Sequence, residues 1–179
     1  MNLPERTGSQ VRFGIALAVP DPYAAALQAA RAGFGDPLAE SIPPHVTLVG
    51  PTVAEPAEMA ELYAHVSEVA RRHRSFELHL RGTGTFRPIS DVVFIQVVRG
   101  IAECEQLERD LRSGPLEQPL RFNYHPHVTV AHEVPDDALD RAFSELADFE
   151  VTYPVTGFEV FGHGDDGVWR VEHQVPFDI

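Results

Sequence analysis

Pro44-His45-Val46-Thr47-Leu48-Val49 is repeated about half a chain later as Pro126-His127-Val128-Thr129-Val130-Ala131. Alternate residues of a β-strand point to the same face, so each copy places its histidine beside its threonine. The valine between them then points to the opposite face, toward hydrophobic packing. Because a proline keeps the residue before it extended, the prolines ahead of each histidine favour a strand. Each copy therefore predicts a strand that presents one imidazole and one hydroxyl side by side.

The segments around these two strands repeat as well. Each motif is followed by a helical pattern, by a Phe-Glu-apolar triplet and by a glycine that precedes another strand. We interpret this order as an internal duplication. With no long linker or low-complexity segment, it predicts one bilobal α+β unit over residues 1–179. The apolar spacing predicts strands at 11–19, 45–49, 76–80, 92–98, 127–131, 149–153, 157–161 and 168–175, and helices at 21–31, 56–73, 101–111 and 139–146.

The basic residues are unusual in kind, since all fourteen are arginine and none is lysine. The absence of lysine excludes Schiff-base chemistry, a phosphate-binding Walker lysine and ligation through a lysyl-nucleotide intermediate. Any phosphate contact from a permanently charged side chain must come from arginine, whose planar guanidinium binds phosphate through two N–H groups. An ATP-dependent ligase that acts through lysine is therefore excluded.

The net charge is −13, and residues 133–150 hold seven acidic side chains against one arginine. Duplex nucleic acid is bound mainly by neutralising its phosphates, so we expect no long duplex as a partner and favour a small nucleotide or an RNA terminus. No apolar stretch is long enough to span a bilayer, and the first residues do not resemble a secretory signal. A single cysteine, Cys104, cannot form an internal disulfide. We expect a cytoplasmic monomer that does not associate with membranes.

The paired motif suits the cleavage of a phosphodiester. The reaction needs a base to activate the attacking oxygen and an acid to protonate the leaving oxygen. Histidine, with an ordinary pKa of about 6.5, can serve in either role. The two threonine hydroxyls can bind the non-bridging oxygens of the phosphate, and no metal or cofactor is required. The predicted catalytic residues are His45, Thr47, His127 and Thr129.

These two motifs resemble the signature motifs of the two-histidine (2H) phosphoesterase superfamily. The chain is most similar to the 2′-5′ RNA ligase family, which includes RNA 2′,3′-cyclic phosphodiesterases, from the strand at Val11 to the strand near Val175. The resemblance implies two antiparallel-sheet lobes with flanking helices around a central cleft, and one motif in each lobe. It also implies that His45 is the proton donor and His127 the proton acceptor.

Two positions depart from the pattern of that family. His132 follows the second motif, where the RNA ligase members often have an arginine. The first motif runs into Gly50-Pro51-Thr52, where an aromatic residue is common. Both changes leave the histidine and threonine pairs intact, so they bear on the substrate and not on the acid–base chemistry.

Three residues are predicted to bind the substrate: Phe86 and Tyr124 by stacking on a base, and Arg87 by contacting phosphate. For Phe86 and Arg87 the alternative is a core phenylalanine beside a surface arginine. For the motif histidines, the alternative is a pair of half-buried strand residues without catalytic function. A metal site built from His125, His127, His132 and Glu133 is a further alternative, but the spacing matches no familiar ligand set, and we predict no metal.

The leading functional hypothesis is metal-independent hydrolysis of a 2′,3′-cyclic phosphate on an RNA end or a nucleotide, with the two histidines as acid and base. A second is cleavage or ATP-independent joining of 2′-5′ linkages by the same residues. A third, from another class, is a non-catalytic module that binds nucleotides or RNA ends.

Overall fold

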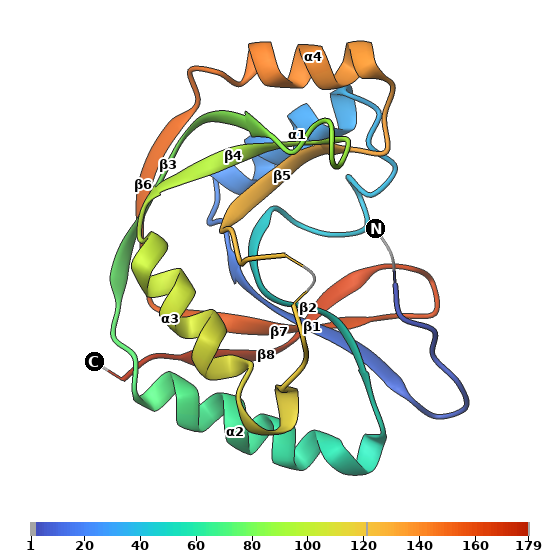
Figure 1. Cartoon of the computed structure of the whole chain (residues 1–179), viewed down its shortest axis with the longest axis vertical. Helices are drawn as coiled ribbons and strands as arrows, with labels where there is room; N and C mark the ends of the chain where they lie inside the picture. The colour runs from blue at the N-terminus through green and yellow to red at the C-terminus, as the bar shows by residue number, and fades with distance from the viewer. Residues whose placement is uncertain (1–2, 121, 179) are drawn as a thin grey trace.

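A computed structural model of the chain describes residues 3–120 and 122–178, which form four α-helices and one eight-stranded antiparallel sheet (Figure 1). Two short 3₁₀ turns, η1 and η2, complete the regular structure of the described residues. In chain order the elements are β1 (Val11–Ala18), α1 (Tyr23–Gly33), β2 (His45–Ala54), η1 (Pro56–Glu58), α2 (Met59–Arg71), β3 (Phe76–Thr85), β4 (Val92–Arg99), α3 (Ile101–Leu111), η2 (Gly114–Leu116), β5 (His127–His132), α4 (Asp136–Glu145), β6 (Glu150–Val155), β7 (Gly157–His163) and β8 (Trp169–Pro176).

The two motif strands, β2 and β5, lie next to each other in the middle of the sheet, whose strand order is β6-β3-β4-β5-β2-β1-β7-β8. They pair at one position, Val46 with Val128, whereas each has a longer ladder with its outer neighbour, β1 or β4. The sheet therefore consists of two four-stranded halves that meet at the motif strands. This arrangement confirms the predicted α+β fold with two related antiparallel lobes.

The two halves are interwoven along the chain. β3 follows β2 in sequence but pairs with β4 and β6 in the opposite half, and β7 and β8 return to extend β1. The helices cross over in the same way: α1 and α4 pack on the half that contains β5, while α2 and α3 pack on the half that contains β2 (Figure 1). No helix in the described part of the chain is long and apolar enough to cross a membrane.

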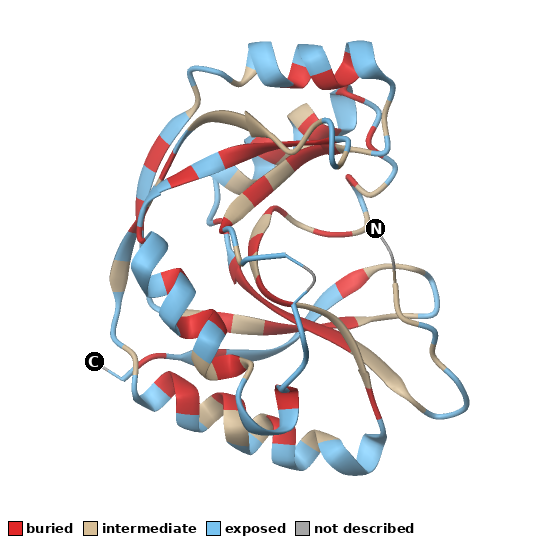
Figure 2. Cartoon of the chain, in the orientation of Figure 1, coloured by how far each residue is buried: buried red, intermediate tan, exposed pale blue. Residues whose placement is uncertain are grey.

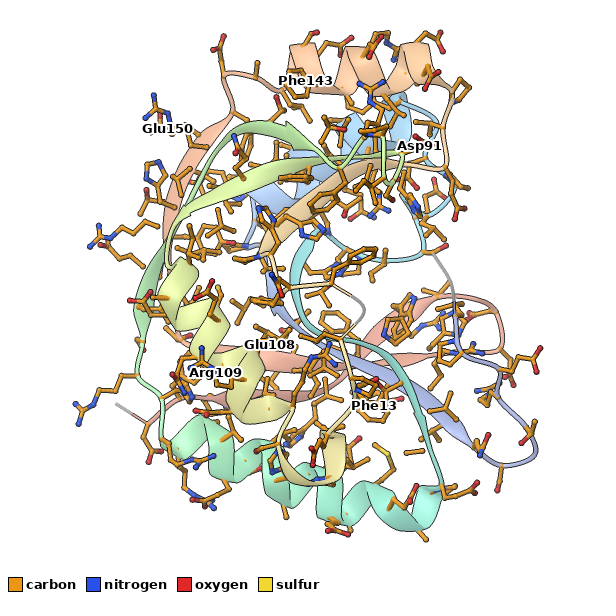
Figure 3. The ribbon with its side chains drawn as sticks, in the orientation of Figure 1. Phe13, Asp91, Glu108, Arg109, Phe143 and Glu150 are labelled. Carbon is orange, nitrogen blue, oxygen red and sulfur yellow. The ribbon has the colours of Figure 1, made fainter. Side chains whose placement is uncertain are left out.

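The core lies between the sheet and these helices. On β1 the side chains of Phe13 (labelled in Figure 3), Ile15 and Leu17 are almost completely buried, as the alternation of apolar residues predicts. Figure 2 shows buried residues along the sheet and on the sides of the helices that face it. The residues that follow each motif histidine, Val46 and Val128, have no exposed surface and belong to the same core cluster. The opposite face of β2 and β5, which carries the motif histidines and threonines, is called the motif face below.

A β-bulge follows the threonine in each motif strand. In β2 the extra residue is Leu48, because Thr47 pairs with Ala16 of β1 and Val49 pairs with the adjacent Ile15. In β5 it is Val130, because Thr129 pairs with Phe94 of β4 and Ala131 pairs with the adjacent Val93. A bulge puts two successive residues of one strand against one of its partner. Two consecutive residues are therefore buried after each threonine, and the next residue returns to the motif face. Those returning residues are Gly50 and His132.

The predicted elements agree with the observed ones, apart from their ends. The strands that begin at His45 and Phe76 continue to Ala54 and Thr85, beyond their apolar stretches, because the ladders to β1 and β4 continue there. The first helix begins at Tyr23, so Pro22 precedes it and is not its first helical residue. Residues 56–58 form a separate 3₁₀ turn ahead of α2.

A buried ion pair joins α1 to the end of β5. Arg31 Nε donates to Asp36 Oδ2 at 2.8 Å, and the two side chains are 4% and 0% exposed. The Asp36 carboxylate also accepts the backbone N–H groups of Leu38 at 2.8 Å and His132 at 3.0 Å. One carboxylate therefore links the end of α1, the loop that leads into β2, and the end of β5.

Replacing Asp36 with alanine is expected to lower the free energy of unfolding by about 3–5 kcal/mol, because it leaves the buried Arg31 cation without its partner. Urea denaturation of the wild type and D36A measures this loss. The control is Glu68→Ala, which removes an exposed ion pair with Arg71 and should change stability little. Equal, small losses in both variants would show that the buried pair does not support the fold as described.

Candidate active site

The register between β2 and β5 brings the four predicted catalytic side chains onto one face. Val46 lies opposite Val128 and both are buried, so the residues on either side of each valine point to the motif face. Each motif histidine then lies across from the threonine of the other strand, in the pairs His45–Thr129 and His127–Thr47. His45 and His127 are diagonal neighbours, whose backbone positions in antiparallel sheets are about 7–8 Å apart.

Each motif histidine is oriented by a backbone carbonyl two residues earlier. His45 Nδ1 lies 2.8 Å from the carbonyl oxygen of Pro43, and His127 Nδ1 lies 2.7 Å from that of His125. Because a carbonyl oxygen only accepts, Nδ1 carries the proton in both rings. Among the described residues neither Nε2 atom has a hydrogen-bond partner, so it can take a proton from a ligand or, once protonated, donate one.

Both imidazoles are neutral at pH 7 when the site is empty. Burial lowers the pKa of His45 from 6.5 to about 4. The hydrogen bond to the Pro43 carbonyl opposes this shift, whereas the charge of Arg31, and that of His127 when it is protonated, add to it. Burial is also the main cause of the lowered pKa of His127. A neutral imidazole acts as a base, so a histidine that serves as the acid needs a bound anion to raise its pKa.

Aromatic side chains surround His127. The rings of Phe86 and Phe94 lie 4.9 Å and 5.1 Å from its ring, between centroids, and the Phe86 ring is almost perpendicular to it. The ring of His125 is 6.0 Å away. On the other side of the site, His45 has one aromatic neighbour in the same range, Phe161 at 6.4 Å.

A small hollow of about 40 Å³ opens beside His45 and Thr47. Apart from these two side chains, its walls come from small and apolar residues of β1, β2, β7 and β8 and of the loop before β2. They include Gly14, Ala16, Ile42, Gly50, Phe161 and Trp169.

The three predicted substrate-binding residues have different surroundings. Phe86 contacts His127 and so lies at the site. The guanidinium of Arg87 pairs with Asp140 of α4 at 2.8 Å. The hydroxyl of Tyr124 donates to the carbonyl oxygen of Thr47 at 2.9 Å, and its ring packs against the core. Arg87 and Tyr124 therefore have structural partners in the empty site, whereas Phe86 forms part of the wall around His127.

Oxygen-binding groups are available between the imidazoles. Within the part of the chain that the structure describes, the hydroxyls of Thr47 and Thr129 make no hydrogen bond. In residues 3–120 and 122–178, no three or more histidine, cysteine, aspartate or glutamate side chains are grouped so as to hold a metal ion. The site therefore consists of two imidazoles and two hydroxyls that are free to bind a ligand.

Three neighbours of the site were not predicted from the sequence. Phe94 lies on the motif face together with Val92. Alternation along β4 indicates this only when it is known which face of the strand is buried. Trp169 reaches the site only because β8 pairs with β7. Arg31 affects His45 through space from α1, and no local pattern in the sequence marks it.

The lowered pKa of His45 predicts a pH-dependent stability. Its folded-state pKa is below 6.5, so the unfolded chain binds this proton more tightly, and stability is lost as the pH falls from about 6.5 toward 4. The loss from this residue is at most about 3 kcal/mol. Replacement by asparagine, which does not titrate, should reduce the fall in the free energy of unfolding between pH 7 and pH 5, measured by urea denaturation. If the free energy of unfolding falls as much in H45N as in the wild type between pH 7 and pH 5, His45 does not have the lowered pKa that its burial implies.

Comparison with known proteins identifies the family of the chain. A family model described as the 2′-5′ RNA ligase superfamily matches residues 19–167. A Bacillus mycoides protein named "Putative phosphoesterase" is 25% identical over 140 residues, which cover 76% of this chain and 80% of the relative. Among solved structures, E. coli LigT has a TM-score of 0.66 at 19% identity, covering 95% of this chain and 99% of LigT. Kluyveromyces marxianus Usb1 has a TM-score of 0.53 at 14% identity, covering 94% of this chain and 97% of Usb1.

The similarity to LigT and Usb1 shows that the chain shares their fold. The family model covers most of the chain. Family membership supports a phosphoesterase- or ligase-type activity. The chain belongs to the 2′-5′ RNA ligase superfamily.

Proposed function

We propose that the protein hydrolyses the 2′,3′-cyclic phosphate of a small nucleotide or an RNA end, without a metal ion, using His45 and His127 as an acid–base pair. The observation that carries this proposal is the register of β2 and β5, which sets each imidazole across from a threonine hydroxyl. Two oriented imidazoles with available Nε2 atoms match the two proton transfers of the reaction.

The proposed reaction is an in-line displacement at phosphorus. The basic Nε2 takes a proton from water as the water oxygen attacks phosphorus. The bond between phosphorus and the 3′ oxygen breaks, and the other histidine donates its proton to that oxygen. The products are a 2′-phosphomonoester and a free 3′ hydroxyl, and one water has been consumed. The proton then returns from one histidine to the other through solvent.

Thr47 and Thr129 are proposed to bind the two non-bridging oxygens, where the negative charge of the transition state accumulates. The family resemblance makes His45 the proton donor and His127 the acceptor. For His45 to hold a proton near neutral pH, the bound phosphate must raise its pKa from about 4, which an adjacent negative charge does. Substrate binding and charging of the acid are thus coupled in this scheme.

A small substrate is supported by charge and by family likeness. The net charge of −13 disfavours long polyanions, and Arg87 is engaged by Asp140. Solved complexes of E. coli LigT, which shares the fold, contain 3′-AMP or NADP+. The cytoplasmic location and the monomeric state expected from the sequence stay predictions.

The family description favours a second candidate, the cleavage or ATP-independent joining of 2′-5′ linkages by the same four residues. Analysis of the products formed from 2′-5′ oligonucleotides separates it from hydrolysis of a cyclic phosphate. A non-catalytic binding module is the third candidate, and a cyclic nucleotide that binds without turnover would favour it.

Alanine at either histidine should remove most of the activity. With 2′,3′-cyclic nucleotides in EDTA, His45→Ala and His127→Ala are each expected to lower kcat by roughly 10²–10⁴-fold, the contribution of one positioned acid or base. The matched control is His173→Ala, an exposed histidine of β8. Activity that is equal in all four proteins, or absent from all of them, would refute the proposal for these substrates.

The threonines should act on the transition state. Thr47→Val and Thr129→Val keep the shape of the side chain but remove the hydroxyl, and each is expected to lower kcat by up to roughly 10²–10³-fold with a smaller change in KM. Thr152→Val, at an exposed position of β6, serves as the control. Full activity in both motif variants would mean that the hydroxyls do not bind the reacting phosphate.

A further inference from the structure

The backbone join between the two halves of the site is short. β2 and β5 pair at Val46 and Val128, and within the described residues this pairing does not continue to Thr47 and His127. Each of the two strands has a longer ladder with its outer neighbour, β1 or β4. Thr47 and His127 belong to different halves of the site, so the spacing between them depends on contacts outside the ladder.

A tyrosine hydroxyl supplies such a contact. Tyr124 lies three residues before His127, and its hydroxyl donates to the carbonyl oxygen of Thr47 at 2.9 Å. The segment between η2 and β5 passes beside β2 (Figure 1), where the side-chain amide of Gln118 also donates to the exposed Thr52 hydroxyl at 3.2 Å. Of these two bonds, the one from Tyr124 lies at the motif. It joins the chain that leads into β5 to β2, one residue beyond the backbone pair.

The surroundings of Tyr124 keep its hydroxyl in place as a donor. Its ring packs against the main core cluster, so the core sets the position of the hydroxyl. Burial raises the pKa of the Tyr124 phenol above its ordinary value of 10.0, and the hydroxyl therefore keeps its proton in the neutral range. A carbonyl oxygen only accepts, so the hydrogen bond to Thr47 persists across that range.

We propose that Tyr124 is a positioning residue of the active site: its hydroxyl fixes the backbone of Thr47 relative to His127, so that the Thr47 hydroxyl and the His127 imidazole meet the same phosphate. The inference rests on the proposed function for the position of that phosphate. A displacement of about 1 Å at a reacting group can cost about 10²-fold in rate, so this spacing matters for catalysis. The role differs from the base stacking that the sequence predicts for Tyr124.

A second buried tyrosine provides a matched control. Tyr153 of β6 belongs to the core cluster against which Tyr124 packs, and its hydroxyl is buried with no hydrogen-bond partner in the described part of the chain. Tyr124→Phe and Tyr153→Phe therefore remove the same atom from similar surroundings, but only Y124F breaks a hydrogen bond. A difference in activity between the two variants reports the bond to Thr47.

With a 2′,3′-cyclic nucleotide, Y124F is expected to lower kcat at least roughly fivefold and to change KM less, whereas Y153F should keep the wild-type values. In a Thr47→Val background, Y124F should lower kcat by less than about twofold further, because the hydroxyl that Tyr124 positions is already absent. Steady-state kinetics of the wild type, both single variants and the double variant measure this coupling. A loss of equal size in both backgrounds would show a general structural role and overturn the inference, as would wild-type kcat in Y124F.

A transition-state analogue tests the positioning without turnover. The cyclic complex of adenosine with vanadate has the trigonal bipyramid of an in-line displacement, and Y124F should bind it at least roughly fivefold more weakly than the wild type and Y153F do. Calorimetry measures the three affinities. If the wild type binds this complex but does not hydrolyse cyclic nucleotides, the hydrolytic function fails, and weaker binding by Y124F still supports the positioning role. Equal binding by Y124F, or no binding by the wild type, would overturn that role.

Discussion

The pairing of Val46 with Val128 is the constraint on which the rest of the structure depends. Both valines are completely buried, so the register of β2 against β5 is set by the core. Because side chains alternate along a strand, a slip of one residue would turn the histidine and the threonine of the slipped strand into the core and the valine between them to the surface. The hydrophobic core thereby determines which polar groups meet on the opposite face, and the site is a consequence of packing.

The same framework gives the two halves of the site different properties. Both histidines are held by a carbonyl two residues earlier, and both strands bulge after the threonine. The surroundings then diverge, because His127 lies against the rings of Phe86 and Phe94 whereas His45 has one aromatic neighbour, Phe161, among the described residues. Two similar strands thus present the same pair of side chains, an imidazole and a hydroxyl, in different surroundings.

Local patterns predicted the parts of the fold that depend on local sequence. Alternation in the motif strands identified the side chains that share a face, and apolar spacing located the helices and most strand starts. The pairing of β2 with β5, and the exchange of β3 and β7 between the halves, depend on contacts between distant segments that no local period encodes. Counting alternate residues from Thr129 places His132 in the core, and only the bulge returns it to the motif face. Asp36 was missed because its role arises from a buried charge on α1 and a backbone group on β5.

The dependence of kcat/KM on pH, measured in EDTA with a 2′,3′-cyclic nucleotide, tests the central claim that His45 and His127 act as one acid–base pair. This ratio reports the pKa values of the free enzyme, and both are lowered by burial. The account predicts a bell-shaped profile with its maximum below pH 6.5, from which one limb disappears in His127→Ala. A kcat/KM that is independent of pH, or that rises continuously with pH as hydroxide attack would, contradicts it.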